Sequence, residues 1–140
     1  MCIRDRQLAA LKSWLSPSDW TKIEYIYQEN KRVHQVANYL FQGDAAAIGT
    51  CLSQTHRGLS KQYQVSLSEV DTLVDIVTNK KGIYGARMMG GGFGGSVLIL
   101  GEEKTMESNL QETLQEYHAR TQIQAEIIEF ELAGGIELIS

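Results

Sequence analysis

The residues from Gly90 to Gly95 are the part of this chain best suited to contact a ligand through the backbone. Five of these six residues are glycine, and Phe93 is the exception. Glycine loses much conformational entropy on folding, so a run of glycines is expected where a phosphate, a sugar or another backbone must come close. Main-chain N–H groups in such a turn can donate hydrogen bonds to phosphate or sugar oxygens.

The glycine spacing matches known phosphate-binding patterns only in part. Gly90, Gly92 and Gly95 satisfy G-x-G-x-x-G, but a dinucleotide-binding fold needs a helix directly after the loop, and Ser96–Leu100 has the composition of a strand. With Val97 the same glycines fit a protein-kinase pattern, yet the other kinase motifs are absent and the chain is too short. A Walker P-loop is excluded because no Gly-Lys-Ser or Gly-Lys-Thr occurs. A turn that merely lets two elements pack closely is the structural alternative.

Two strands are expected to hold this loop. Residues Ile83–Met89 and Ser96–Leu100 flank the glycines and are largely apolar. Successive side chains of a strand point to opposite faces, so at most one of Met88 and Met89 is expected to face a ligand.

Capping signals predict the helices around this hairpin. A first helix is expected from Ser16 to about Phe41, and Asp44 caps a second. Ser66 and Glu69 have the spacing of a capping box for a third helix. The first helix is expected to bury an apolar face that includes Val33, Leu40 and Phe41 and to stop at Gly43, and Gln62–Ser66 is expected to be extended.

The second half of the chain is expected to add a helix and a strand. The third helix should stop at Gly82, and a fourth helix should run over Glu102–Arg120 with Met106, Leu110, Leu114 and Tyr117 facing the core. A last strand is expected over Gln122–Leu132, with a bulge near Ile127 and Ile128.

This order of elements indicates an α+β fold with helices on one face of a small, mainly antiparallel sheet. The strand-strand-helix-strand half corresponds to a ferredoxin-like sandwich, preceded by additional N-terminal helices. With 140 residues, 43% of them hydrophobic, the chain can build one core. Residues 16–140 are expected to form this domain, and residues 1–15 to be a partial or spurious N-terminal segment.

Charge and cysteine content narrow the function classes. A net charge of −4 argues against a general nucleic-acid binder, which would be basic. No apolar run reaches the roughly 18 residues that suggest a membrane span, and the start lacks the apolar stretch of a secretory signal. Cys2 and Cys51 suggest neither a disulfide scaffold nor a zinc site. The expected location is the cytoplasm, with no membrane or nucleic-acid partner.

The sequence of the glycine loop resembles the third signature motif of galactokinases, sugar kinases of the GHMP superfamily. Residues Gly85 to Ser96 read Gly-Ala-Arg-Met-Met-Gly-Gly-Gly-Phe-Gly-Gly-Ser. The family form has Thr where this chain has Met89 and Cys where it has Ser96. A second match begins at Ser53, with Tyr63-Gln64-Val65-Ser66 as its most specific part, and a third lies near Glu29. The resemblance extends from about Trp20 to the C-terminus.

The resemblance implies the GHMP kinase C-terminal domain type of a two-domain enzyme. Such enzymes transfer the γ-phosphoryl group of ATP to the anomeric hydroxyl of galactose, using magnesium. The N-terminal domain of the family supplies the phosphate loop, the sugar-binding motif, a catalytic Asp and an Arg, and none of those motifs occurs here. The resemblance therefore implies a fragment that is inactive alone, with ATP and Mg²⁺ bound mainly by the missing domain.

The site residues that the resemblance implies lie in the glycine loop. Gly90, Gly91, Gly92, Phe93, Gly94 and Gly95 are expected to bind substrate or ATP, with Arg87, Met89 and Ser96 as possible supporting residues. No catalytic residue and no metal ligand is assigned to this chain. The expected partners are galactose, ATP and the N-terminal domain of the same protein. Two alternatives stay open, namely another GHMP kinase that acts on a different sugar or small alcohol, or a non-catalytic ferredoxin-like module that binds a metabolite.

His56 is the most notable residue outside the loop. It lies next to Arg57 on a predicted amphipathic helix. We expect a capping or buried, hydrogen-bonded histidine here rather than a catalytic one.

Overall fold

The structure, a computed structural model, describes residues 11–130 of the chain. Most of the predicted segment 1–15 and the end of the predicted last strand lie outside this range. The elements, in chain order, are a short 3-10 helix η1 (Lys12–Trp14), α2 (Pro17–Gln42), α3 (Ala45–Gly58), a π-helical segment η2 (Leu59–Tyr63), α4 (Ser68–Thr78), β1 (Ile83–Met88), β2 (Val97–Gly101) and α5 (Glu103–Thr121).

The helical hairpin of α2 and α3 begins and turns where its capping residues predict. The Ser16 hydroxyl accepts a hydrogen bond from the amide of Asp19 at 3.1 Å. Gly43 ends α2 with a φ of 68°, a left-handed conformation that glycine adopts without strain. The Asp44 carboxylate then accepts from the amide of Ala47 at 2.9 Å. These predictions are confirmed.

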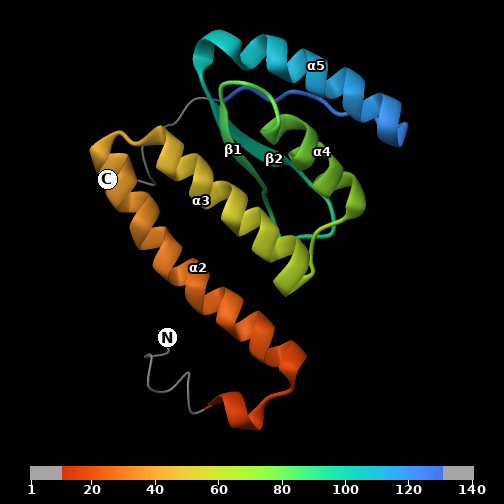
Figure 1. Cartoon of the computed structure of the whole chain (residues 1–140). Coiled ribbons are helices and arrows are strands. Elements are labelled where there is room, and N and C mark those ends of the chain that lie inside the picture. The colour runs from red at the N-terminus through yellow and green to blue at the C-terminus, as the bar shows by residue number, and fades with distance from the viewer. Residues whose placement is uncertain (1–10, 131–140) are drawn as a thin grey trace, which may run out of the picture.

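The apolar face predicted for α2 is wrong over its second half. Val33, Leu40 and Phe41 expose 66%, 64% and 93% of their surface. In Figure 1, α2 lies at the edge of the molecule, with α3 between it and the sheet. Its inward contacts are with α3 and η2, and Tyr25 is its one buried residue among those described. The spacing of apolar residues predicts the helix but cannot say whether a neighbour covers its stripe.

The segment between α3 and α4 differs from its prediction. Gln62 and Tyr63 belong to the π-helical η2 rather than to an extended segment, and Gln64 follows with a left-handed φ of 61°. Ser66 does not cap α4, because its hydroxyl donates to Asp71 at 2.6 Å instead, and Leu67 occupies the N-cap position.

The third predicted helix also ends earlier than expected. Helix α4 stops at Thr78, and the Asn79 side chain donates to the carbonyl of Asp75 at 2.7 Å. Gly82 has a φ of 85° and forms part of the turn that leads into β1 rather than the helix stop.

The two strands form an antiparallel ladder that carries the glycine loop at one end. Met88 pairs with Val97, next to the loop, and Ile83 pairs with Gly101 at the far end. Met89 and Ser96 lie just outside both strands, but the Met89 amide still donates to the Ser96 carbonyl at 2.8 Å. The core at this sheet consists of Val74, Val77 and Ala86, with Ile83, Val97 and Ile99 packed around it.

The predicted last strand is wrong for the residues that the structure describes. Residues 123–130 have neither helical nor strand structure, and Ile128 and Phe130 expose 74% and 64% of their surface. An alternating segment becomes a strand only when its N–H and C=O groups pair with a neighbour. Within residues 11–130, the sheet contains β1 and β2 alone. The α+β class with an antiparallel sheet is confirmed.

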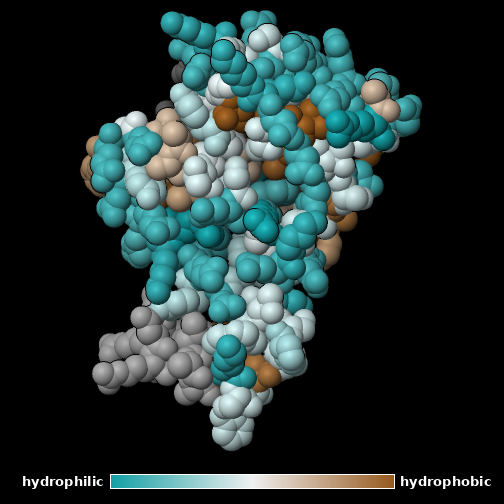
Figure 2. Space-filling model, in the orientation of Figure 1, coloured by the Kyte–Doolittle hydropathy of each residue, from teal (hydrophilic) through white to brown (hydrophobic). Residues whose placement is uncertain are grey.

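Helix α5 covers one end of this arrangement. Tyr117 is buried, and the other residues predicted to face the core are half-buried. Buried Asn109 adds a polar contact, because its side chain donates to the Lys81 carbonyl at 2.9 Å. The face in Figure 2 is mostly hydrophilic, and hydrophobic residues gather mainly beneath α5. Among the described helices, none is long and apolar enough to cross a membrane.

Candidate functional site

The glycine loop lies at the surface in a backbone conformation that requires glycine at several positions. Gly90, Gly92, Gly94 and Gly95 have φ values of 93°, 99°, 120° and 114°. Side chains other than glycine rarely adopt this region. Phe93 adopts it as well, with a φ of 60°, and exposes 73% of its surface. A strained, exposed phenylalanine within a glycine turn suggests that the ring is presented outward.

Two hydrogen bonds hold the loop on the rest of the domain. The Met89 amide donates to the Ser96 carbonyl and closes the base of the loop. At the tip, the Phe93 amide donates to the carbonyl of Val65 at 2.7 Å. A Cβ atom on Gly92 would lie only 2.7 Å from the Cβ of Val65, so this glycine permits the contact. The loop is therefore docked on the connector between η2 and α4.

The other loop amides have donor capacity that the described residues leave unused. Among the described residues, we find no acceptor for the N–H groups of the glycines at positions 90, 91, 92, 94 and 95. Consecutive free amides in a turn of this kind form a concave anion-binding surface. The loop thus has the donors that a phosphate or sugar oxygen needs.

Gly91 differs from its neighbours in the loop. A Cβ atom there would meet nothing within 4 Å, and its φ is not in the left-handed region. The described part of the chain gives no steric reason for glycine at this position.

The three supporting residues proposed from the sequence surround the base of the loop. Arg87 is half-buried, and its Nε donates to the Met88 carbonyl at 3.0 Å. Met89 is 41% exposed, whereas the preceding Met88 is 1% exposed, so the two point in different directions. Ser96 is exposed next to Gly95. All three lie close to the loop in the chain, and Met89 and Ser96 also join across its base.

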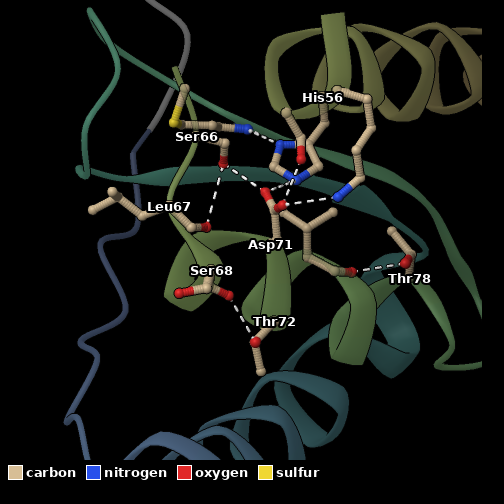
Figure 3. A network of polar contacts seen from close by, with 11 residues as sticks. His56, Ser66, Leu67, Ser68, Asp71, Thr72 and Thr78 are labelled. Atoms are coloured by element: carbon tan, nitrogen blue, oxygen red, sulfur yellow. Dashed lines mark hydrogen bonds and ion pairs between the residues drawn. The ribbon is translucent and has the colours of Figure 1, made fainter. Parts of the chain in front are cut away.

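A polar cluster surrounds His56, which is buried, and Asp71, which is half-buried (Figure 3). The Nε2 atom of His56 lies 3.3 Å from Oδ1 of Asp71, and His56 Nδ1 accepts a hydrogen bond from the Met88 amide at 3.3 Å. The Asp71 carboxylate also accepts from the hydroxyls of Ser60 and Ser66, at 2.5 and 2.6 Å. The expectation of a buried, hydrogen-bonded His56 is confirmed. Sequence reasoning missed the role of Asp71 and of the two serines.

The environment of this cluster favours neutral His56 and ionised Asp71. Burial lowers the pKa of His56, and this effect outweighs the attraction of Asp71 and Asp75 for the imidazolium form. Burial alone would raise the pKa of Asp71, but the hydroxyl donors, His56 and Lys61 together hold it below its usual value. An open groove of about 400 Å³ borders both side chains.

A contact between two glycines sets the distance between α3 and β1. A Cβ atom on Gly85 would lie 1.9 Å from the carbonyl oxygen of Gly49, and one on Gly49 would lie 2.3 Å from the Tyr84 backbone. Both glycines are buried. Sequence reasoning missed this contact, although a glycine within a predicted helix and another within a predicted strand are each a signal of close backbone approach.

Within residues 11–130, no group of three or more His, Cys, Asp or Glu side chains could hold a metal ion. The loop amides suit an anion such as a nucleotide phosphate, and they offer no ligand to a cation.

Comparisons with known proteins agree with the sequence resemblance. A galactokinase of Thermotoga neapolitana is 36% identical over 118 residues, which cover 84% of this chain and 34% of that protein. A galactokinase of Chloroflexus aggregans is 34% identical over 119 residues, covering 85% of this chain and 30% of that protein. The chain thus spans about a third of the length of the curated relatives it matches.

A solved structure shares the fold. The crystal structure of Lactococcus lactis galactokinase complexed with galactose superposes with a TM-score of 0.80 at 23% identity, covering 87% of this chain and 32% of that one. The family model described as GHMP kinases C terminal matches residues 36–120, which is more than half of the chain and includes both strands, the glycine loop and the polar cluster around His56. The chain therefore belongs to the GHMP kinase C-terminal family.

Proposed function

We propose that this chain is the C-terminal part of a galactokinase, which phosphorylates galactose at the anomeric hydroxyl with ATP. The observation that carries the proposal is the exposed glycine loop, with its free amides, in a chain whose relatives at about 35% identity are named galactokinases. Residues 16–140 form the C-terminal domain in this proposal. The chain alone is inactive, and the complete enzyme acts in the cytoplasm.

The loop contributes position and hydrogen-bond donors rather than chemistry. Phosphoryl transfer depends mostly on holding the two substrates in line and stabilising charge on the transferred group. Free amides of Gly90–Gly95 donate to oxygens of the nucleotide or the sugar, and the exposed Phe93 packs against the N-terminal domain or the ligand. Arg87, Met89 and Ser96 support the loop from its base. Magnesium, which neutralises phosphate charge when bound, is held mainly by residues of the N-terminal domain.

The test is to join the chain to its native N-terminal region and to measure ATP-dependent phosphorylation of several hexoses. Galactose 1-phosphate as the main product supports the proposal. Activity on another small alcohol, without galactose, would instead favour a different GHMP kinase. Metabolite binding by the 140-residue chain, with no phosphoryl transfer in either form, would favour a non-catalytic module.

A further inference from the structure

The amide of Met88 points away from the partner strand. The next amide, that of Met89, donates across the hairpin to Ser96. Because N–H groups of an antiparallel strand alternate between its two edges, the Met88 amide faces the opposite edge. Its acceptor there is Nδ1 of His56, at 3.3 Å, in a buried hydrogen bond. The His56 side chain therefore accepts the hydrogen bond of the last amide of β1, just before the glycine loop.

Helix α3 carries His56 to this position along β1. The contact of Gly49 with Gly85 fixes where the helix meets the strand. From Gly49 to His56 the helix rises about 10.5 Å, at 1.5 Å per residue. From Gly85 to Met88 the strand rises about 10 Å, at 3.3 Å per residue. The two intervals match, so His56 lies opposite the Met88 amide.

The two polar contacts of the His56 ring, with Met88 and with Asp71, favour one neutral form of the imidazole. Since Nδ1 accepts from Met88, the proton must be on Nε2, which faces Asp71 Oδ1 at 3.3 Å. A second proton on Nδ1 would set two donors against each other and break the bond to Met88. The histidine thus has a state that holds the strand end and a state that releases it.

Asp71 is also linked to the tip of the loop, which is held by the hydrogen bond between Phe93 and Val65. Ser66, which donates to Asp71, follows Val65, whose carbonyl accepts from the Phe93 amide. Figure 3 shows His56 and Ser66 both in contact with the Asp71 carboxylate. The base of the loop, through Met88 and His56, and its tip, through Val65 and Ser66, are therefore both linked to one carboxylate.

The charged groups around His56 come from several elements. Asp71 and Asp75 of α4 favour its protonation, whereas Lys61 of η2 and Arg87 of β1 oppose it. Arg57, on the same helix as His56, lines the groove that His56 also borders. Because this groove is open to solvent, protons can reach the imidazole through it.

We infer that His56, oriented by Asp71, is a positioning residue that holds the glycine loop in place for an anionic substrate and releases it on protonation. This inference rests on the proposed function for the identity of the substrate, but the loop anchor itself can be measured without any activity.

The first experiment uses the 140-residue chain and nuclear magnetic resonance. At pH 7.5 we expect the ¹⁵N signals of the His56 ring to show a proton on Nε2 only. On lowering the pH, protonation of Nδ1 should coincide with a shift of the Met88 amide signal. The amides of Met88 and Phe93 should also lose protection from hydrogen exchange, measured against the intrinsic exchange rate at each pH. A ring with its proton on Nδ1 at pH 7.5, or a titration that leaves the Met88 amide unchanged, would overturn the inference.

The second experiment uses a matched pair of variants in the chain joined to its native N-terminal region. In His56→Asn, a side-chain oxygen can replace Nδ1 as the acceptor, whereas His56→Gln places its polar atoms where Nε2 lies. We expect His56→Gln to lower kcat at least tenfold at pH 7.5, with a smaller change in KM for ATP. His56→Asn should keep most of kcat and lose the decline of activity at acid pH that the unchanged protein shows.

The outcomes separate this inference from the proposed function. Equal activities and equal pH profiles for both variants and the unchanged enzyme would overturn the role of His56. If the unchanged enzyme phosphorylates no substrate, the proposed function fails, and the resonance experiment alone decides whether His56 holds the loop. If His56→Gln does not fold, the resonance titration of the unchanged chain likewise decides.

Discussion

Glycine serves two different purposes in this molecule, one at the contact between α3 and β1 and one in the loop that follows β1. At the contact, Gly49 and Gly85 are buried, and a Cβ atom on either would overlap backbone atoms. In the loop, Gly90 and Gly91 have open space, and the backbone angle alone requires glycine at Gly90. The fold explains the first pair, whereas the described residues give no steric reason for glycine at Gly91. Substitutions should therefore affect stability in one region and activity in the other.

The largest effect is expected at the buried contact. In Gly85→Ala, the new Cβ would lie 1.9 Å from the carbonyl oxygen of Gly49, and two backbones cannot move apart as a flexible side chain can. We expect the free energy of unfolding to fall by about 3 kcal/mol or more, measured by chemical denaturation. A loss below roughly 1 kcal/mol would mean that α3 and β1 are not in the close contact described.

The next effect should appear in activity rather than stability. For Gly91→Val, in the chain joined to its native N-terminal region, we expect kcat/KM to fall roughly 100-fold, because the side chain occupies space that the ligand needs. The melting temperature should stay within about 2 °C, since the loss of stability should be small. Gly91→Ala serves as the graded control, and its kcat/KM should lie between those of Gly91→Val and the unchanged enzyme. Unchanged kcat/KM in Gly91→Val would contradict a ligand-facing loop.

A smaller effect should distinguish two glycines within the loop. Gly90 and Gly92 share a left-handed φ, of 93° and 99°, but only Gly92 packs against Val65. We expect Gly90→Ala to cost about 1 kcal/mol of stability from backbone strain, and Gly92→Ala about 2 kcal/mol because strain and overlap add. Equal losses in denaturation measurements would show that the Val65 contact contributes nothing.

The smallest expected effect concerns pH. The pKa of His56 is lowered in the folded chain, so the unfolded chain binds its proton first as the pH falls below the ordinary value of 6.5. The stability that His56 contributes is therefore complete above pH 6.5 and decreases as the pH falls towards its folded pKa. Denaturation between pH 7.5 and 5 should show this decrease in the unchanged chain and a shallower one in His56→Asn. An increase in stability on acidification would contradict this prediction.

Local signals predicted the fold wherever a few adjacent residues decide the structure. Ser16, Gly43 and Asp44 cap helices as expected, because each bonds to backbone groups three or four residues away. Ser66 failed as a cap because a carboxylate five residues along competes for its hydroxyl. The prediction of a strand after α5 was wrong because strand pairing depends on a neighbouring strand, which the residues of the segment do not specify.

The candidate site could be predicted only in part for the same reason. The glycine loop is contiguous in sequence, so its residues could be named from the chain. The cluster behind it joins His56, Asp71 and Met88, which are brought together by the packing of α3 and α4 on β1. A single histidine on an amphipathic helix indicated a buried, hydrogen-bonded side chain, but its spacing did not identify Met88 and Asp71 as its partners.

The matching rises of α3 and β1 have a consequence for changes in chain length. One residue added between Gly49 and His56 would advance the imidazole by about 1.5 Å and turn it by about 100° around the helix, away from the strand. One residue added between Gly85 and Met88 would reverse the edge to which the amide points. Insertions and deletions should therefore be absent from these two short intervals in working members of the family, while the exposed turn between α2 and α3 can vary in length.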